Sequence, residues 1–324
     1  MSGNRVAVVA LAAVGLGLGL TADAHAQTYP SRPIKIITPN TPGSPVDALG
    51  RVMAEHLQAR LGQSVILENR PGGSQSIGAK AVATADADGY TLLLFSNGHY
   101  FGLVTNPGYD PVKSFTPVAT VAQWNHVLVV RPDFQAKTVS ELVAFARSHP
   151  GKVTFGFGLS TPPQILGETL KNVTGADITS VPYRGGAQAV TDMLGGRIDM
   201  NFGTTATLLS LIQEKKVRAI AYTGVKRNRD LPDVLTMTES GFPQLSFNPD
   251  NWTGLSAPAG TAKAVIDRLY TAIDDSLRSS ELLASFKKFG FEVMIEQQAD
   301  LEAFIAAEAQ RWPQIVSAAG LKPE

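Results

Sequence analysis

The feature that most constrains this chain is a strand, a tight loop and a helix start that follow one another directly near the N-terminus. Residues 34–38 form a short apolar, β-branched run, which is typical of a buried strand. Residues 39–43 hold two prolines, an asparagine and a glycine, which predict a tight loop. Ser44 is then a candidate N-cap, Pro45 occupies the first helical position, and Asp47 lies three residues after the cap. Such a start gathers unpaired backbone N–H groups at the positive end of the helix dipole, which favours an anion.

The same alternation continues up to residue 95. The next predicted elements are helices and strands at residues 45–60, 64–68, 76–85 and 90–95. This β-α-β-α-β order predicts a parallel sheet with right-handed crossovers. Open sheets of this kind bind ligands beyond the carboxyl ends of their strands. Ser96 and Asn97 follow such an end and are therefore candidate ligand-binding residues.

A second unit of the same kind begins near residue 153. Residues 152–157 predict a strand, Gly158 and Thr161 flank Ser160 in a loop, and two prolines open the next helix. We therefore expect an α/β protein with two similarly built lobes, although the sequence shows no internal repeat. The polar stretch 123–126, between two predicted strands, is a candidate hinge.

Two weaker elements are predicted toward the C-terminus. Residues 233–239 favour a short helix within a long polar stretch, and residues 291–295 favour a last strand. A long helix over residues 301–319 is expected to close the chain.

The first 26 residues have the pattern of a cleaved secretory signal. Arg5 gives a positive start, residues 6–20 form an apolar run, and residues 24–26 supply a small-x-small cleavage site. A transmembrane helix is the alternative, but the run is shorter than the roughly 20 residues that a span needs. The mature chain is therefore expected to begin at Gln27 and to be secreted.

Composition narrows the possible functions. The chain has 28 Lys and Arg against 28 Asp and Glu, so a basic surface for nucleic acid or anionic lipid is not indicated. It has no cysteine, which excludes a disulfide and a thiol nucleophile. A hydrophobic content of 44% is ordinary for a globular α/β protein, and the length suggests about two domains.

Residues suited to enzyme chemistry are sparse. A serine nucleophile on a strand-to-helix elbow needs Gly-x-Ser-x-Gly, and the nearest match, around Ser160, has Pro162 in place of the second glycine. The glycine loops lack a Walker lysine, and Thr161 stands where a dinucleotide loop has its third glycine. Four histidines lack metal-site spacing, and each is expected at the surface or in a loop: His56, His99, His126 and His149. The sequence therefore indicates no catalytic residue, metal or cofactor. The alternative is a secreted hydrolase or transferase that uses Ser160.

Two loops that combine glycine with hydroxyl residues remain, one at residues 41–44 and one at residues 158–161. Each lies between the end of a predicted strand and the start of a predicted helix. In a two-lobed secreted chain without catalytic groups, we interpret them as two halves of one anion site. The alternative is that they are ordinary turns, since every βα unit needs one.

Four other side chains have two interpretations each. Asp47 either caps its own helix or contacts a cationic ligand group. Arg184 either binds a carboxylate as a bidentate donor or is a solvated loop residue. Trp124 and Trp252 either pack the hinge or form an aromatic wall for a ligand.

Six short motifs lead to a family. They are YPSRPI (29–34), PGSPVD (42–47), ENRPG (68–72), DGYTL (88–92), VPYRG (181–185) and DMLGG (192–196). In this order and spacing, the chain resembles the Bug (TctC) family of extracytoplasmic solute receptors over essentially its whole mature length. These are the binding components of tripartite tricarboxylate transporters.

The resemblance implies a type II periplasmic-binding-protein clamshell with a hinge. Its discontinuous domains would be residues 27–124 with 251–324, and residues 125–250. It also implies a ligand carboxylate that loop amides and ordered waters hold between the lobes. The first loop would contribute Thr41, Pro42, Gly43, Ser44, Val46 and Asp47. The opposing loop would contribute Gly158, Leu159, Ser160, Thr161, Pro163 and Gln164. Ser96, Asn97, Arg184, Gly203 and Thr204, beyond the ends of other strands, complete the predicted set.

The sequence departs from the family pattern at three of these positions. Ser44 replaces a usual glycine, Gln164 a common histidine, and Gly203 a common aspartate. The last two departures weaken the expectation of a small dicarboxylate or an amino acid. An aromatic carboxylate such as terephthalate becomes a candidate, because Pro163, Phe101 and the tryptophans make the cleft more apolar. The hydroxyl of Ser44 either adjoins the ligand or only caps the helix.

The resemblance thus implies a monomeric, non-enzymatic periplasmic receptor that closes on a small organic carboxylate, aromatic or dicarboxylic, by hinge motion near residues 122–126 and 249–253. Its partners would be the membrane permease subunits of a tripartite tricarboxylate transporter, with no nucleic acid and no cofactor. A receptor that serves a sensor kinase is the remaining alternative.

Overall fold

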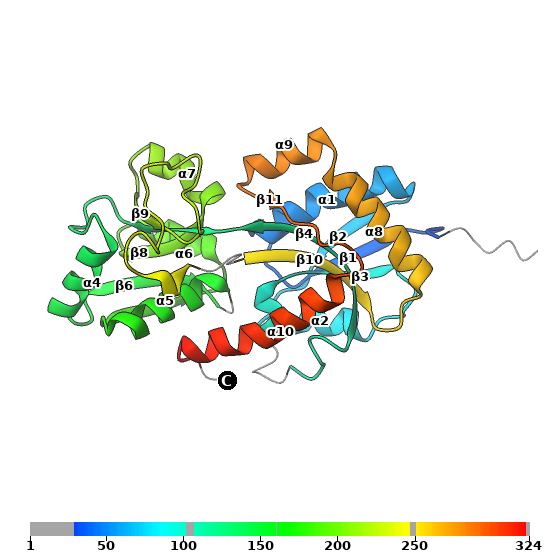
Figure 1. The fold of residues 1–324 in the computed structure, drawn as a ribbon, viewed down its shortest axis with the longest axis horizontal. Coiled ribbons are helices and arrows are strands. Elements are labelled where there is room, and N and C mark those ends of the chain that lie inside the picture. Colours follow the sequence, from blue (N-terminus) through cyan, green and yellow to red (C-terminus); the bar gives the residue numbers. More distant parts are fainter. Residues whose placement is uncertain (1–28, 102–106, 160, 247–250, 322–324) are drawn as a thin grey trace, which may run out of the picture.

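Two β-sheets with helices packed on them make up the molecule. The computed structural model describes residues 29–101, 107–159, 161–246 and 251–321. Figure 1 shows the sheets in two lobes that lie side by side. The predicted two-lobed α/β fold is therefore confirmed, whereas the predicted signal peptide lies outside the described residues.

Lobe 1 is the six-stranded sheet with its helices. Its strand order is β11-β4-β10-β3-β1-β2. The strands are β1 (Ile34–Thr38), β2 (Val65–Asn69), β3 (Thr91–Ser96), β4 (Phe115–Trp124), β10 (Asn251–Pro258) and β11 (Glu292–Val293). The helices are α1 (Pro45–Leu61), α2 (Ser76–Ala83), the 3-10 helix η1 (Asn97–Phe101), α8 (Lys263–Leu277), α9 (Ser280–Lys288) and α10 (Leu301–Ala318). Strand β1 pairs in parallel with β2 and β3, as the strand-helix alternation predicts, whereas β10 is antiparallel to β3 and β4.

Lobe 2 is the five-stranded sheet with its helices. Its strand order is β7-β6-β8-β5-β9. The strands are β5 (His126–Val130), β6 (Val153–Gly158), β7 (Ile178–Tyr183), β8 (Met200–Thr204) and β9 (Arg218–Tyr222). The helices are α4 (Val139–Ser148), α5 (Pro162–Thr174), α6 (Gly186–Leu194), α7 (Thr205–Gln213) and the 3-10 helix η2 (Pro243–Leu245). Strand β6 is parallel to β7 and β8, which matches the second predicted unit.

Helix α1 illustrates how local sequence sets an element's limits. Ser44 is in extended conformation and its side chain accepts a hydrogen bond from the N–H of Asp47, so it caps the helix start. Gly62 ends the helix with a φ of 68°, a left-handed conformation that glycine adopts without strain. Between these caps, Leu49, Met53 and other apolar residues at helical spacing lie in the core of lobe 1.

The two sheets are joined through a very short connection. Strand β4 ends at Trp124 and β5 begins at His126, so Asn125 alone separates them. Strand β10 begins at Asn251, which pairs with Trp124. The indoles of Trp124 and Trp252 are 3% and 0% exposed, so both pack the region of the connection. The hinge itself stays a prediction.

Two predicted elements differ from the structure. Residues 233–239 form turns instead of a helix, because the N–H of Tyr222 donates to Leu235 and the N–H of Met237 to Tyr222, which attaches this segment to the edge of β9. The last strand is confined to Glu292 and Val293, which pair with β4. In both places, pairing with a distant strand decides the local structure.

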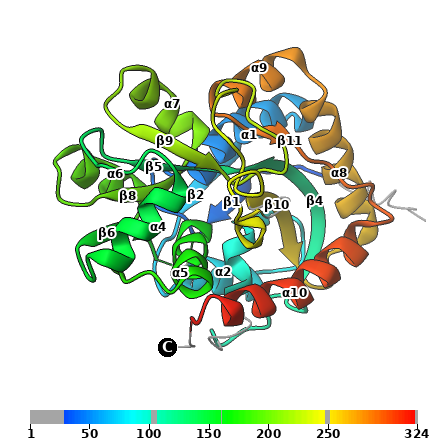
Figure 2. The same ribbon diagram turned by 60° about the vertical axis from the view of Figure 1, so that its left-hand side comes forward.

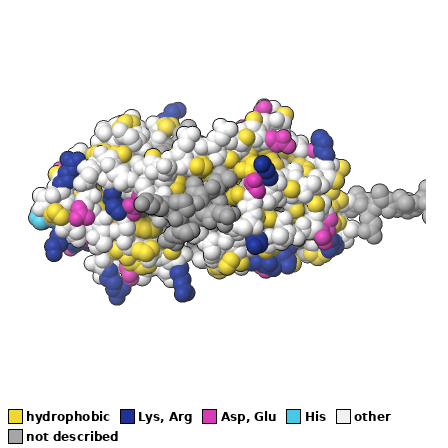
Figure 3. Space-filling view, turned by 90° about the horizontal axis from the view of Figure 1, so that it is seen from below, with side chains coloured by type: hydrophobic (Ala, Val, Ile, Leu, Met, Phe, Trp, Pro, Cys, Tyr) yellow, Lys and Arg dark blue, Asp and Glu magenta, His cyan; other side chains and the backbone are white. Residues whose placement is uncertain are grey.

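Charged residues are dispersed over the surface. Figure 3 shows basic and acidic side chains scattered across the face seen from below, without one large patch of either sign. Among the described residues, no helix combines the length and the apolar character needed to cross a bilayer.

The C-terminal helix α10 is fixed to lobe 1 by a buried carboxylate. Glu308 is 4% exposed. Its Oε2 accepts hydrogen bonds from the indole N–H groups of Trp252 at 2.6 Å and Trp312 at 2.8 Å. Its Oε1 accepts from Arg311 at 2.8 Å. The carboxylate thereby ties α10 to β10, next to the connection between the lobes.

Replacing Glu308 should strongly destabilise the protein. Glu308→Ala leaves two indole N–H groups without acceptors and should lower the free energy of unfolding by about 3 kcal/mol. Glu308→Gln should recover part of this stability, because its amide oxygen can accept from both indole N–H groups while its NH₂ faces the partly exposed Arg311. Urea unfolding measures both effects, with exposed Glu302→Ala as the control on the same helix. A Glu308→Ala protein as stable as the control would contradict this role.

Candidate functional site

Loops that follow the carboxyl ends of parallel strands come into contact between the two lobes. In lobe 1, α1, α2 and η1 follow the carboxyl ends of β1, β2 and β3, and in lobe 2, α5, α6 and α7 follow β6, β7 and β8. A Cβ placed on Gly185, which precedes α6, would lie 3.1 Å from Oγ1 of Thr41, which precedes α1. The loop before α1 therefore touches lobe 2, and this contact locates the candidate site.

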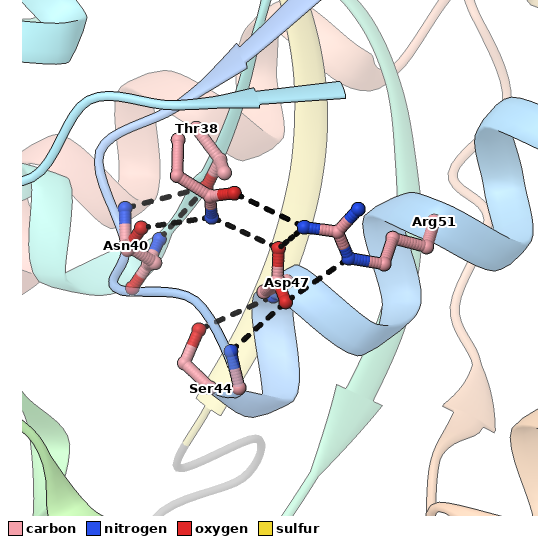
Figure 4. Close-up of polar contacts among 7 residues, drawn as sticks. Thr38, Asn40, Ser44, Asp47 and Arg51 are labelled. Atoms are coloured by element: carbon pink, nitrogen blue, oxygen red, sulfur yellow. Dashed lines mark hydrogen bonds and ion pairs between the residues drawn. The ribbon is translucent and has the colours of Figure 1, made fainter. Parts of the chain in front are cut away.

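The loop before α1 is held by its own carboxylate (Figure 4). Asp47 Oδ2 accepts from the N–H of Gly43 at 2.9 Å, and Oδ1 accepts from Asn69 Nδ2 at 2.9 Å. Arg51 donates to both oxygens, from Nε at 3.2 Å and Nη2 at 3.0 Å. Asn69 also donates to the carbonyl of Asn40, which ties β2 to the loop. The Asp47 carboxylate thus holds the loop before α1 and does not cap the helix itself, because among the described residues it accepts no hydrogen bond from a first-turn N–H of α1.

This network leaves the start of α1 with few free donors. Pro45 has no N–H, and the N–H groups of Asp47 and Ala48 are bonded to the side chain and the carbonyl of Ser44. Burial raises the pKa of Asp47, but the hydrogen bonds from Gly43, Asn69 and Arg51 outweigh burial and hold that pKa below its usual value. The Ser44 oxygen caps the helix by accepting from the N–H of Asp47, and its hydroxyl proton can still be donated.

The start of α6 in lobe 2 is different. Gly185 is its N-cap and supplies no side-chain acceptor, and Gly186 and Ala187 follow it in the first turn, both exposed. A Cβ placed on Gly186 would have no atom within 4 Å, so open space adjoins this turn. The exposed Arg184 stands immediately before it. Unlike the start of α1, this helix start combines uncapped N–H groups with a neighbouring cation.

Helix α5 contributes shape more than donors. Its first two residues are prolines without N–H groups, and the N–H of Gln164 is bonded to the carbonyl of Thr161. Thr161 Oγ1 donates to the carbonyl of Gly158 at 2.6 Å and does not cap the helix. A Cβ placed on Gly158 would lie 3.3 Å from the nitrogen of Gly186, so this glycine lets the starts of α5 and α6 approach each other.

The structure places the predicted site residues in three groups. Residues of the two loops stand before or at the starts of α1 and α5, and among them Thr41 makes the contact with the other lobe: Thr41, Pro42, Gly43, Ser44, Asp47, Gly158, Leu159, Thr161, Pro163 and Gln164. Other side chains are buried or engaged: Val46 lies in the lobe 1 core, Ser96 and Asn97 are 3% and 0% exposed, and Thr204 caps α7. Ser160 lies outside the described residues. Contact of any of these residues with a ligand stays a prediction.

Gly203 is tightly packed against α7. A Cβ at this position would lie 2.5 Å from Cδ1 of Leu208. The absence of a side chain at residue 203 therefore serves helix packing in this chain.

Gly185 and Gly186 are the residues that sequence reasoning missed. The motif VPYRG contains the first of them, and a glycine pair between a strand and a helix is the pattern that could have identified them. Among the described residues, no group of three histidine or carboxylate side chains is placed to hold a metal ion.

The expected exposure of the histidines is wrong for two of them. His126 is 1% exposed in β5, and His99 is 3% exposed in η1, directly after the carboxyl end of β3. His99 Nε2 is 3.0 Å from the carbonyl of Pro111, and its ring packs among aromatic rings that include Phe95 and Phe115. Burial lowers the pKa of His99 to about 4, so the ring is neutral at pH 7.

Comparison with known proteins gives consistent results. A family model described as the tripartite tricarboxylate transporter family receptor, TctC, matches residues 49–321. Protein BugT of Bordetella pertussis is 35% identical over 320 residues, which cover 96% of this chain and 98% of BugT.

Two solved structures are similar over most of the chain. An R. palustris protein with adipate has a TM-score of 0.83 and 30% identity, with 91% of this chain and 100% of that chain covered. MatC from Rhodopseudomonas palustris with bound malate has a TM-score of 0.80 and 26% identity, with 89% and 100% covered.

The Asp47 network predicts a pH-dependent contribution to stability. Because its folded pKa is lowered, the carboxylate stabilises the fold above its ordinary pKa near 3.8, and this contribution is lost as the pH falls through the folded value. Asp47→Asn should therefore cost about 1–3 kcal/mol of unfolding free energy at pH 7 and progressively less below pH 4. Urea unfolding at several pH values measures this, with exposed Asp86→Asn as the control. An equal deficit at pH 7 and pH 3 would contradict the charge-based explanation.

His99 predicts a second pH effect, in a different range. Its pKa falls from 6.5 to about 4 on folding, so unfolded chains bind an extra proton between these values, and stability is full above pH 6.5 and declines below it. The loss between pH 6.5 and pH 5 should be about 2 kcal/mol. His99→Leu should flatten this slope, whereas exposed His149→Leu should not. If the His99→Leu protein loses stability as steeply below pH 6.5 as the unaltered protein, other groups cause the pH dependence.

Proposed function

The chain belongs to the tripartite tricarboxylate transporter receptor (TctC) family, and from this membership we propose that it captures a small organic carboxylate between its lobes and delivers it to the permease subunits of such a transporter. The adipate and the malate in the two similar structures support a carboxylate as the ligand class. In this role the protein is a binding component and not an enzyme.

One observation carries the choice of ligand class: the uncapped start of α6 beside the loop before α1. Gly185 provides no side-chain acceptor, Gly186 adjoins open space, and Thr41 of lobe 1 lies directly across. A carboxylate there would accept backbone N–H bonds and gain from the helix dipole. Arg184, the cation next to this turn, forms no ion pair with a described residue, so its charge is available to the ligand.

Lobe 1 would complete the site from the opposite side. The hydroxyls of Thr41 and Ser44 are only partly buried, and Ser44 can donate its proton while its oxygen caps α1. Because Asp47 is neutralised by Arg51 and held by Gly43 and Asn69, it fixes the loop without repelling an anion strongly.

The proposed capture is a hinge motion of two domains. The domains are residues 27–124 with 251–324 and residues 125–250, and the hinge lies near residues 122–126 and 249–253. The single residue Asn125 between the sheets supports this placement, because so short a connection confines rotation to few backbone dihedrals. The mature protein is proposed to be a periplasmic monomer after removal of residues 1–26.

Calorimetry with a ligand panel tests the proposed function. The mature protein is titrated with aliphatic and aromatic mono- and dicarboxylates, among them adipate, malate and terephthalate, and with matched amides as uncharged controls. At least one carboxylate should bind and its amide should not. Binding of amines or sugars in place of every carboxylate would refute the proposal.

A single substitution tests the role of the α6 start. Arg184→Ala should weaken binding of the best carboxylate about tenfold or more, since charge-assisted hydrogen bonds are worth about 1.5–3 kcal/mol. Arg184→Lys should recover part of the affinity, because it keeps the charge without the bidentate geometry. Arg229→Ala, another exposed arginine of lobe 2, is the matched control. Equal affinities of the Arg184→Ala and Arg229→Ala proteins would remove Arg184 from the site.

A further inference from the structure

Helix α10 belongs to lobe 1 but ends against lobe 2. Figures 1 and 2 both show it running beneath the molecule, with its C-terminal end close to α5. Its first turns are anchored in lobe 1 by the buried Leu301 and Ile305, and its middle is held there by Glu308 through Trp252. The helix therefore projects from lobe 1 as a rigid element.

The far end of α10 forms a polar contact with α5. Asn172 Nδ2 donates to the carbonyl of Ala318 at 3.2 Å. Gly320 follows with a φ of 70°, and a Cβ placed there would lie 2.9 Å from Asn172 Nδ2. The turn after α10 is therefore fitted closely to this one side chain of lobe 2.

An apolar contact lies in the first turn of α5. Ile165 is 1% exposed and belongs to an apolar cluster whose other members all come from lobe 1. These members include Val316 and Ala319 at the end of α10, Trp312, and Trp252 of β10. Separating the lobes at this point would bring the side chain of Ile165 into water, which is unfavourable for a buried aliphatic group.

The contacted helix also borders the candidate ligand site. Helix α5 starts at Pro162, directly after the loop that contains Gly158 and Thr161, and Ile165 lies in its first turn. The orientation of α5 relative to lobe 1 thus sets where that loop stands opposite the loop before α1.

We propose that the end of α10 is a latch that holds α5 against lobe 1 in the closed orientation. Ile165 and Asn172 are then positioning residues for ligand capture, although neither needs to touch the ligand. This inference rests on the proposed carboxylate-receptor function. Because apparent affinity scales with the populated fraction of the binding-competent state, the latch raises affinity by favouring closure before the ligand arrives.

Spin labels can report the separation of the lobes directly. The chain has no cysteine, so Ile66→Cys in lobe 1 and Val225→Cys in lobe 2, both at exposed positions, give a uniquely labelled pair. Label-to-label distances are measured without ligand and with the best carboxylate of the panel. This background is combined with Asn172→Ala, with Ile165→Ala, and with Val173→Ala as an exposed control on the same helix.

The latch predicts a specific pattern. Without ligand, Asn172→Ala and Ile165→Ala should shift the distance distribution from the closed distance toward larger separations, whereas Val173→Ala should not. With saturating ligand, all variants should return to the closed distance. Calorimetry should show binding about two- to tenfold weaker for Asn172→Ala, the range expected for loss of one neutral hydrogen bond.

Two outcomes would overturn the latch: ligand-free distributions that neither latch substitution changes, or a Val173→Ala effect as large as that of Asn172→Ala. If Ile165→Ala does not fold, Asn172→Ala decides the matter. The two tests are separable, because the label-to-label distances without ligand can be measured whatever the protein binds. A protein that binds no carboxylate would refute the proposed function, and the ligand-free distances would still decide whether the latch exists.

Discussion

The structure depends on the single residue that separates its two sheets. Trp124 closes one sheet and His126 opens the other, so the strands β4 and β5 are nearly one continuous path through both lobes. His126 is held in lobe 2, because its carbonyl accepts hydrogen bonds from both the N–H and the hydroxyl of Thr223. Trp124 is fixed on the near side by packing on Phe291. Both flanks of Asn125 are therefore held, which supports the proposed hinge at this residue.

The two helix starts that meet between the lobes, those of α1 and α6, differ in chemistry. In the loop before α1, the N–H of Gly43 donates to the Asp47 carboxylate and the N–H of Asp47 donates to the Ser44 hydroxyl. These backbone donors are therefore already bonded within the loop. The start of α6 has Gly185 at its N-cap and no side-chain cap, so no side-chain acceptor satisfies its first N–H groups, as the proposed anion site requires. Of the two helix starts, the one of α6 therefore fits the proposed anion site better.

Local patterns predicted the α/β alternation, the Ser44 cap and the two loops, because each depends on residues a few positions apart. The structure differs where distant residues decide. Residues 233–239 pair with β9 and form no helix, and His99 is buried because Pro111 and several aromatic rings surround it. The contact between Gly185 and Thr41 joins residues from different lobes, and no local pattern encodes such a contact. The family resemblance supplied the face-to-face arrangement of the loops but not the different use of their N–H groups.

The strand order has a consequence for how the chain acquires its structure during synthesis. Strand β10 lies between β3 and β4, so β4 has no neighbour in the sheet of lobe 1 until residues 251–258 have left the ribosome. All strands of lobe 2, by contrast, lie within residues 126–222 and can pair with one another as soon as they emerge. The inserted lobe is therefore the first to have a complete sheet, and the lobe that contains the N-terminus is completed last. Until then β4 presents an unpaired edge, which is the state of this chain most open to wrong pairing.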